Sequence, residues 1–236
     1  IQISAGWMHS GYPFMAHTVS VPDVTNLSHI STQGDWGMFH ELGHNHQWMD
    51  ATLPGNTETT CNLFSAYIMT ELVGVDLATG HGAMSSSNRE TRTEGYFNAG
   101  AQISQWSVWT ALETHMQIQE EFGWDVFTRA FEHYYNSSLG QPNNDAQEYN
   151  SWAARMSNET GMNLVPYFQA WGLPIDAGTF TAVDHLPIWN DDPLRGWVYD
   201  YPSLLSGFSS SNLTSSSATV HWENYDNGTE VNQTLC

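Results

Sequence analysis

The stretch that decides the fold is Gly34-Asp35-Trp36-Gly37-Met38-Phe39-His40-Glu41-Leu42-Gly43-His44-Asn45-His46-Gln47. Within it, His40, Glu41 and His44 form the pattern H-E-x-x-H. At 3.6 residues per helical turn, residues four apart lie one above the other on the same face. Two stacked imidazoles can bind one tetrahedral Zn²⁺, and Glu41 projects beside them, where it can deprotonate a metal-bound water. The stretch therefore predicts a helix that carries two zinc ligands and a general base.

A third ligand is expected from the next helix, because a catalytic zinc ion normally takes three protein ligands and keeps a fourth position for water. Glu58 lies one connection downstream of His44, and Pro54-Gly55 supplies the turn between the two helices. Asn62 follows Glu58 by one helical turn, so it can hydrogen-bond a ligand imidazole and fix its tautomer. The predicted site has His40, His44 and Glu58 as metal ligands, Glu41 as catalytic base and Asn62 as a supporting partner.

Two other interpretations of the motif stay open at this point. The five residues also occur by accident, on an ordinary amphipathic helix that carries two surface histidines and a glutamate. Alternatively, Asp50 is the third ligand, since H-E-x-x-H-x-x-Q-x-x-D resembles a metzincin pattern. That pattern needs glycine where this chain has Gln47, because the backbone must turn sharply there.

Two longer patterns surround the metal motif: Trp36-Gly37-x-x-His40-Glu41-Leu42-Gly43-His44-x-x-Gln47 and then Thr57-Glu58-x-Thr60-x-Asn62. Together they resemble the M60-like (enhancin-type) metallopeptidases of the gluzincin group, and residues 9–13 and 163–172 also look like that family. The resemblance spans roughly residues 5 to 175. By position it makes His40, His44 and Glu58 the ligands and Glu41 the base.

The resemblance implies an α+β fold with a short N-terminal β region, the two site helices and a mainly helical C-terminal lobe. It implies one catalytic Zn²⁺ as cofactor. It further implies a secreted or cell-surface endopeptidase that acts on O-glycosylated, mucin-like glycoproteins.

Charge restricts the partners of the chain. The formal net charge is −20, from 25 acidic residues and five basic ones. Nucleic acid and anionic membrane surfaces would be repelled, so neither is expected as a partner. No run of 18 apolar residues occurs, and no membrane insertion is expected.

The 11 tryptophans suit stacking on carbohydrate, although tryptophan more often packs in a core.

Cysteines and glycosylation sequons bear on the compartment. Cys61 lies within the expected ligand helix, so a buried thiol is favoured over a disulfide with Cys236. The chain starts at Ile1 without a signal peptide, which suggests a processed chain or a fragment. The N-x-S/T acceptors fit a secreted protein. They are Asn26, Asn136, Asn158, Asn212, Asn227 and Asn232.

Periodicity predicts the remaining elements. Short strands are expected in residues 1–22 and a long loop in 75–100. His115 and His133 are expected on helix surfaces. Helices are expected at 35–50, 57–74, 103–119, 122–135, 144–156 and 163–170, and strands with loops at 173–203.

The composition changes after residue 203, which predicts a peptidase domain at 1–203 and a separate Ser/Thr/Asn-rich segment at 204–236. That segment is either a glycosylated tail or the start of a fibronectin III-like sandwich. A third class of function also stays open, a non-catalytic glycoprotein-binding or structural module that retains the peptidase fold. The complete set of His40, Glu41, His44 and Glu58 argues for catalysis, because a binding module needs no general base.

Overall fold

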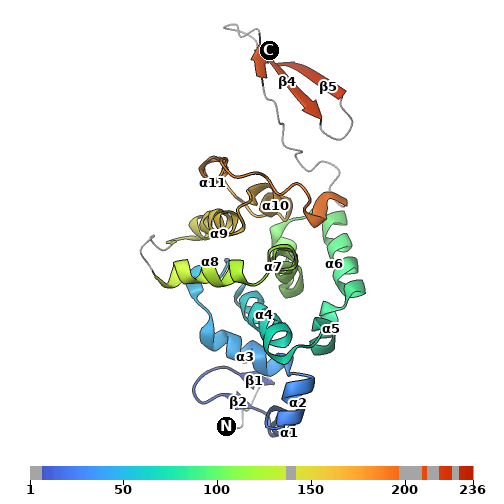
Figure 1. The fold of residues 1–236 in the computed structure, drawn as a ribbon, viewed down its shortest axis with the longest axis vertical. Helices are drawn as coiled ribbons and strands as arrows, with labels where there is room; N and C mark the ends of the chain where they lie inside the picture. The colour runs from blue at the N-terminus through green and yellow to red at the C-terminus, as the bar shows by residue number, and fades with distance from the viewer. Residues whose placement is uncertain (1–6, 137–141, 197–208, 212–217, 225–228, 236) are drawn as a thin grey trace. The chain divides into compact units, whose positions relative to one another are not determined.

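The computed structural model describes residues 7–136 and 142–196 and the strands at 209–211, 218–224 and 229–235. The chain divides into two compact units, residues 1–189 and residues 190–236. The first unit is α+β, mainly helical with one small antiparallel sheet (Figure 1). The boundary predicted between residues 203 and 204 lies outside the described residues.

A small hairpin opens the first unit. Strand β1 (Met8–His9) pairs antiparallel with β2 (Met15–Ala16). Gly11 lies in the connection with φ of 122°, a backbone conformation that side chains disfavour. The strands expected in residues 1–22 are therefore present but short, and residues 1–6 are outside the described part. Two short helices follow, α1 (Val21–Val24) and α2 (Leu27–Thr32).

Helices α3 (Trp36–His46) and α4 (Thr57–Tyr67) carry the metal motif and lie side by side (Figure 1). Helix α3 begins after Asp35, whose carboxylate accepts the N–H of Met38 at 2.8 Å. Helix α4 continues into a π-helical segment, Ile68–Val73. The connection between α3 and α4 contains a short 3-10 turn, Met49–Ala51.

Gly43 sets how closely α3 approaches α4. A Cβ atom added at Gly43 would lie 2.7 Å from the carbonyl oxygen of Cys61 and 3.0 Å from its Cα. Both atoms belong to the backbone and cannot rotate away. Only glycine at this position permits the observed separation of the two helices.

The helical lobe supplies most of the core. Helix α7 (Val108–Phe122) packs on α4, and α8 (Asp125–Tyr135), α9 (Asp145–Thr160) and α10 (Val165–Ala170) complete it. The helices predicted between residues 103 and 170 are thus present. The largest fully buried side chains include Trp152, Trp171, Tyr134, Tyr167 and Phe168. Much of the aromatic content serves packing.

Two predicted segments are wrong. Residues 75–100 contain α5 (Leu77–Gly80) and the 13-residue α6 (Ser86–Asn98) where a loop was expected. Helix α6 has little apolar periodicity because Arg89 and Arg92 lie on its inner face and bind the buried Glu113 of α7. Residues 177–182 form α11 (Ala177–Ala182) where strands and loops were expected.

The second unit contains a three-stranded antiparallel sheet in the order β3-β4-β5. Its strands are β3 (Ser209–Ser211), β4 (Ala218–Asn224) and β5 (Thr229–Leu235). Val220 lies opposite Gln233 in the register of β4 and β5. The interpretation as the start of a β-sandwich stays a prediction.

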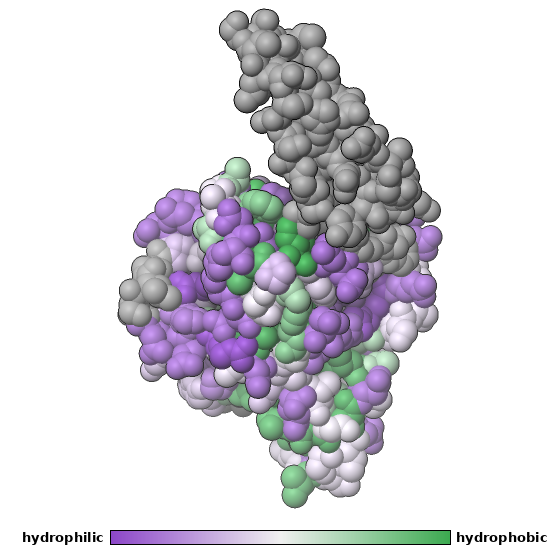
Figure 2. Space-filling view, turned by 45° about the horizontal axis from the view of Figure 1, so that its top comes forward, coloured by the Kyte–Doolittle hydropathy of each residue, from purple (hydrophilic) through white to green (hydrophobic). Residues whose placement is uncertain are grey.

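Among the described residues, no helix combines the length and the apolar character needed to cross a bilayer. Figure 2 shows a face of the molecule that is largely hydrophilic, with smaller apolar patches between the polar areas.

Candidate metal centre

Three predicted ligand side chains converge between α3 and α4. Glu58 Oε2 lies 3.1 Å from His40 Nε2 and 3.5 Å from His44 Nε2. The two imidazole rings are perpendicular, with centroids 4.8 Å apart. The histidine side chains are largely buried, whereas that of Glu58 is 56% exposed. The donor atoms therefore meet at a point that solvent can reach past Glu58.

Asn62 fixes the tautomer of His40. Its Oδ1 accepts the indole N–H of Trp36 at 2.8 Å and also lies 2.8 Å from His40 Nδ1. An indole nitrogen can only donate, so the atom that faces it must be the amide oxygen. An amide oxygen can only accept, so His40 Nδ1 must carry the proton. In the neutral imidazole, His40 Nε2 is then the nitrogen with the lone pair, and it faces Glu58.

Gln47 acts on His44 in the same way. Its Nε2 donates to the main-chain carbonyl of Thr57, and its Oε1 lies 2.9 Å from His44 Nδ1. A carbonyl oxygen can only accept, so the amide orientation is again determined. His44 Nδ1 therefore donates, and in the neutral imidazole Nε2 is the nitrogen that presents a lone pair to Glu58.

When both imidazoles are neutral, two lone pairs and a carboxylate oxygen thus face one another. Three acceptors this close repel each other unless a cation lies between them. Histidine nitrogen and carboxylate oxygen are common ligands of zinc, and a polar partner on the far imidazole nitrogen is usual at such sites. The described residues fit a single divalent metal ion.

Cys61 lies beside this group and was expected to be buried, as it is. Its Sγ is 3.3 Å from His40 Nδ1 and donates to the Glu58 carbonyl at 3.1 Å. Burial raises the pKa of the thiol, and the carboxylates of Glu58 and Glu41 raise it further. The sulfur therefore packs against the His40 ring as a neutral thiol, and Cys236 lies outside the described residues.

Glu41 is half-buried and follows His40 on α3. Its charge adds to the effects of burial and Glu58 that raise the pKa of the Cys61 thiol, and that thiol lies beside His40. A carboxylate at this place in the H-E-x-x-H motif suits a group that accepts a proton from water at the metal site.

Asp50 is not among the potential metal donors that gather in the described part of the chain. That group is His40, His44, Glu58 and Cys61, whose donor atoms lie within 4.8 Å of one another. Asp50 belongs to the 3-10 turn after α3. Burial, the charge of Asp145 and the charge of Asp50 together raise the pKa of Glu148. The geometry therefore disfavours the metzincin-like alternative.

The prediction that His115 lies on a helix surface is wrong. Its side chain is buried between the rings of Phe127 and Trp152, whose centroids are 6.1 and 5.4 Å from its own. Burial lowers its pKa to about 4. His133 is exposed, as expected, and lies 2.7 Å from a carboxylate oxygen of Glu159.

Trp36 and Gln47 are site residues whose roles the H-E-x-x-H motif does not indicate. Trp36 precedes His40 by four residues, and Gln47 follows His44 by three. On a helix both spacings place a side chain next to the histidine, although Gln47 contacts His44 from the extended position directly after α3. The spacing therefore indicates that Trp36 and Gln47 lie near the histidines. It does not show which imidazole nitrogen a neighbouring side chain contacts.

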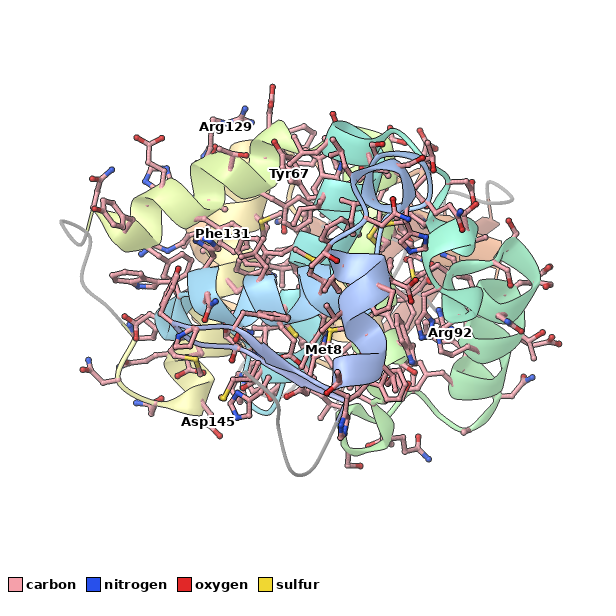
Figure 3. All side chains as sticks on the ribbon, turned by 90° about the horizontal axis from the view of Figure 1, so that it is seen from below. Met8, Tyr67, Arg92, Arg129, Phe131 and Asp145 are labelled. Atoms are coloured by element: carbon pink, nitrogen blue, oxygen red, sulfur yellow. The ribbon has the colours of Figure 1, made fainter. Side chains whose placement is uncertain are left out.

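An apolar hollow of about 300 Å³ lies on the other side of α4. Leu63, Phe64 and Tyr67 line it from α4, and Phe131 lines it from α8. Figure 3 labels Tyr67 and Phe131 on these two helices. Because these α4 positions lie roughly opposite Glu58 around the helix, the hollow is separate from the metal centre.

Solved structures with a similar fold include metallopeptidases. A conserved protein of unknown function from Bacillus anthracis gives a TM-score of 0.70 at 17% identity, over 99% of this chain and 57% of that one. A metallopeptidase from Bacteroides thetaiotaomicron gives 0.58 at 15% identity, over 96% and 49%. The catalytic module of the metalloprotease ZmpA from Clostridium perfringens gives 0.54 at 14% identity, over 95% and 44%. The first unit therefore has a metallopeptidase fold.

Curated relatives share more of the sequence. A TRPM8 channel-associated factor homolog from Xenopus laevis is 42% identical over 199 residues. TRPM8 channel-associated factor 2 from Homo sapiens is also 42% identical over 199 residues. The match covers 84% of this chain and 22% of each relative, so the chain spans only a part of their length.

The family model described as peptidase M60, enhancin and enhancin-like, matches residues 1–172. The matched range contains the hairpin, both site helices and the helical lobe as far as α10. A metal ion is implied by the metallopeptidase fold and fits the donor group described above. The chain belongs to the peptidase M60 family of enhancin and enhancin-like proteins.

Proposed function

We propose that this chain is a zinc-dependent endopeptidase domain. The observation that carries the proposal is the convergence of two imidazole lone pairs and one carboxylate oxygen, with both histidine tautomers fixed from behind. Membership of a peptidase family supports it. A donor set of two histidines and a glutamate is typical of catalytic zinc sites that keep one position open.

In the proposed reaction, His40, His44 and Glu58 hold the metal. A bound zinc ion supplies Lewis-acid activation of water and of the scissile carbonyl. Glu41 takes a proton from the attacking water and delivers it to the leaving amine. Asn62 and Gln47 keep the imidazole nitrogens in the correct tautomer throughout.

The proposed substrate class is O-glycosylated, mucin-like glycoprotein, and the proposed location is extracellular. Support comes from the family resemblance and from a structural neighbour described as a metallopeptidase in complex with Tn antigen, with a TM-score of 0.56 and 15% identity. Sequons such as those at Asn26 and Asn158, both exposed, are compatible with a secreted protein. The net charge of −20 gives anionic glycans no long-range attraction, so recognition would have to be local.

A second candidate is a non-catalytic binding module with a retained peptidase fold. The relatives favour it, since their names describe association with the TRPM8 channel and no hydrolysis. In this candidate function the domain binds a membrane protein or its glycans through its surface. The complete set of His40, Glu41, His44 and Glu58 would then have no catalytic use.

Metal analysis combined with a digestion assay separates the two candidates. The full chain is purified, its zinc content is measured, and it is incubated with an O-glycosylated mucin-type protein. The same protein after enzymatic removal of its O-glycans serves as the matched substrate control. About one zinc per chain and cleavage of the glycosylated substrate support the endopeptidase, whereas stoichiometric binding without cleavage supports the binding module.

Replacing Asn62 with alanine is expected to speed the loss of metal to a chelator by about 10- to 100-fold. The variant leaves His40 Nδ1 and the Trp36 indole without their shared acceptor, and Asn62 is only 3% exposed, so water cannot readily replace it. Release is followed by absorbance of a zinc-sensitive dye. Asn98→Ala, on the exposed end of α6, is the matched control. Equal release from Asn62→Ala and wild type would contradict the predicted role.

A further inference from the structure

We propose that Gln47 is a positioning residue that joins the two ligand helices through a single amide group. The inference rests on the proposed function, because it concerns the same metal centre. The amide oxygen accepts from His44 Nδ1 at 2.9 Å, and the amide nitrogen donates to the main-chain carbonyl of Thr57. One side chain therefore contacts a ligand histidine and the backbone next to the ligand Glu58.

The position of Gln47 in the chain makes this contact possible. Gln47 is the C-cap residue of α3 and directly follows His46, the last helical residue. Its φ of −60° and ψ of 138° are extended backbone. Its side chain folds back from this position toward His44, three residues earlier. Gln47 is partly buried, which limits competition from water for both hydrogen bonds.

Thr57 can accept this contact without loss to α4. It is the first residue of the helix, and its carbonyl has two lone pairs. One lone pair serves the helical hydrogen bond four residues on, and the second is available to the Gln47 amide. The contact therefore holds the first turn of α4, which carries Glu58, at a set distance from the end of α3.

The role of Gln47 differs from that of Asn62. Asn62 lies in the middle of α4 and links His40 with the Trp36 indole, so it acts within the helix packing. Gln47 acts at the C-terminal end of α3, where residues 48–56 connect α3 to α4. The two amides together fix both imidazoles, and each does so from a different helix.

The test compares Gln47→Met with wild type in the full chain. Methionine keeps the length of the side chain and removes both hydrogen bonds. Gln33→Met is the matched control, because Gln33 also ends a helix, α2, and is exposed. Two-bond ¹H–¹⁵N correlation spectra of the metal-free chain report the tautomer of His44. Release of Zn²⁺ from the loaded chain to excess chelator reports metal retention.

We expect His44 to be a single Nδ1–H tautomer in wild type and in Gln33→Met, and a mixture of tautomers in Gln47→Met. We expect zinc release from Gln47→Met to be about 10- to 100-fold faster than from wild type. A single Nδ1–H tautomer together with wild-type release in Gln47→Met would overturn the inference. A purely structural role would not change the tautomer.

Gln47→Glu decides the matter if Gln47→Met fails to fold. A glutamate at this position still accepts from His44 Nδ1 but cannot donate to the Thr57 carbonyl. His44 should then keep its Nδ1–H tautomer, and a tautomer mixture in Gln47→Glu overturns the inference. A wild-type chain that binds zinc but cleaves no substrate contradicts the endopeptidase and leaves the role of Gln47 intact.

Discussion

Replacing Glu41 with glutamine is expected to lower peptide hydrolysis by about 10²- to 10⁴-fold while the fold and the metal are retained. Glutamine matches glutamate in shape but cannot take a proton from water at neutral pH. The ligand side chains and their hydrogen-bond partners lie at other positions, so the substitution removes only the base. Initial rates on a mucin-type substrate, measured with zinc-loaded protein, give the size of the effect.

Glu90→Gln is the matched control for this experiment. Glu90 is an exposed carboxylate on α6, so its loss changes the net charge by the same amount without touching the metal centre. Wild-type hydrolysis by Glu41→Gln would show that another group is the base. A loss of zinc from Glu41→Gln would show that Glu41 contributes to metal binding.

Acidification from pH 7 to pH 4 is expected to cost the folded state roughly 3 kcal/mol through His115 alone. In the folded chain burial lowers the pKa of His115 from 6.5 to about 4. Between these two values the unfolded chain binds a proton at His115 and the folded chain does not. The contribution of His115 to stability is therefore complete above pH 6.5 and is lost as the pH falls toward 4.

The measurement is denaturant unfolding of the metal-free chain at several pH values, for wild type and for His115→Phe. Phenylalanine keeps an aromatic ring beside those of Phe127 and Trp152 and cannot take up a proton. The free energy of unfolding of His115→Phe relative to wild type should rise as the pH falls. The exposed His185, changed to glutamine, is the control and should leave the pH dependence as in wild type. Parallel curves for wild type and His115→Phe would contradict the expected cost.

The metal centre was the part of the structure most accessible to prediction. The spacing of His40 and His44 requires a helix, and Glu58 has only one short connection to cross before it faces them. Local geometry therefore determined which side chains converge. It could not determine hydrogen-bond direction, because that depends on donors such as the Trp36 indole and acceptors such as the Thr57 carbonyl.

Two of the missed features, α6 and the burial of His115, share a physical cause, which is polar groups buried by long-range contacts. Helix α6 is not predicted from the sequence because its inner face carries Arg89 and Arg92 where an apolar stripe is usual. Both arginines donate to the carboxylate of Glu113, 24 and 21 residues away. His115 was placed on a surface because histidine is usually polar and solvated. Its real neighbours, Phe127 and Trp152, come from two other helices that no local pattern connects to it.

Gly43 narrows the motif to H-E-x-G-H in chains built like this one. The two middle positions of H-E-x-x-H are normally treated as free, but a Cβ atom at Gly43 would collide with the Cys61 backbone. The collision would move α4, and with it Glu58 and Asn62, away from the imidazoles. A sequence search that requires this glycine would therefore reject most accidental matches and retain chains whose second ligand helix packs directly against the first.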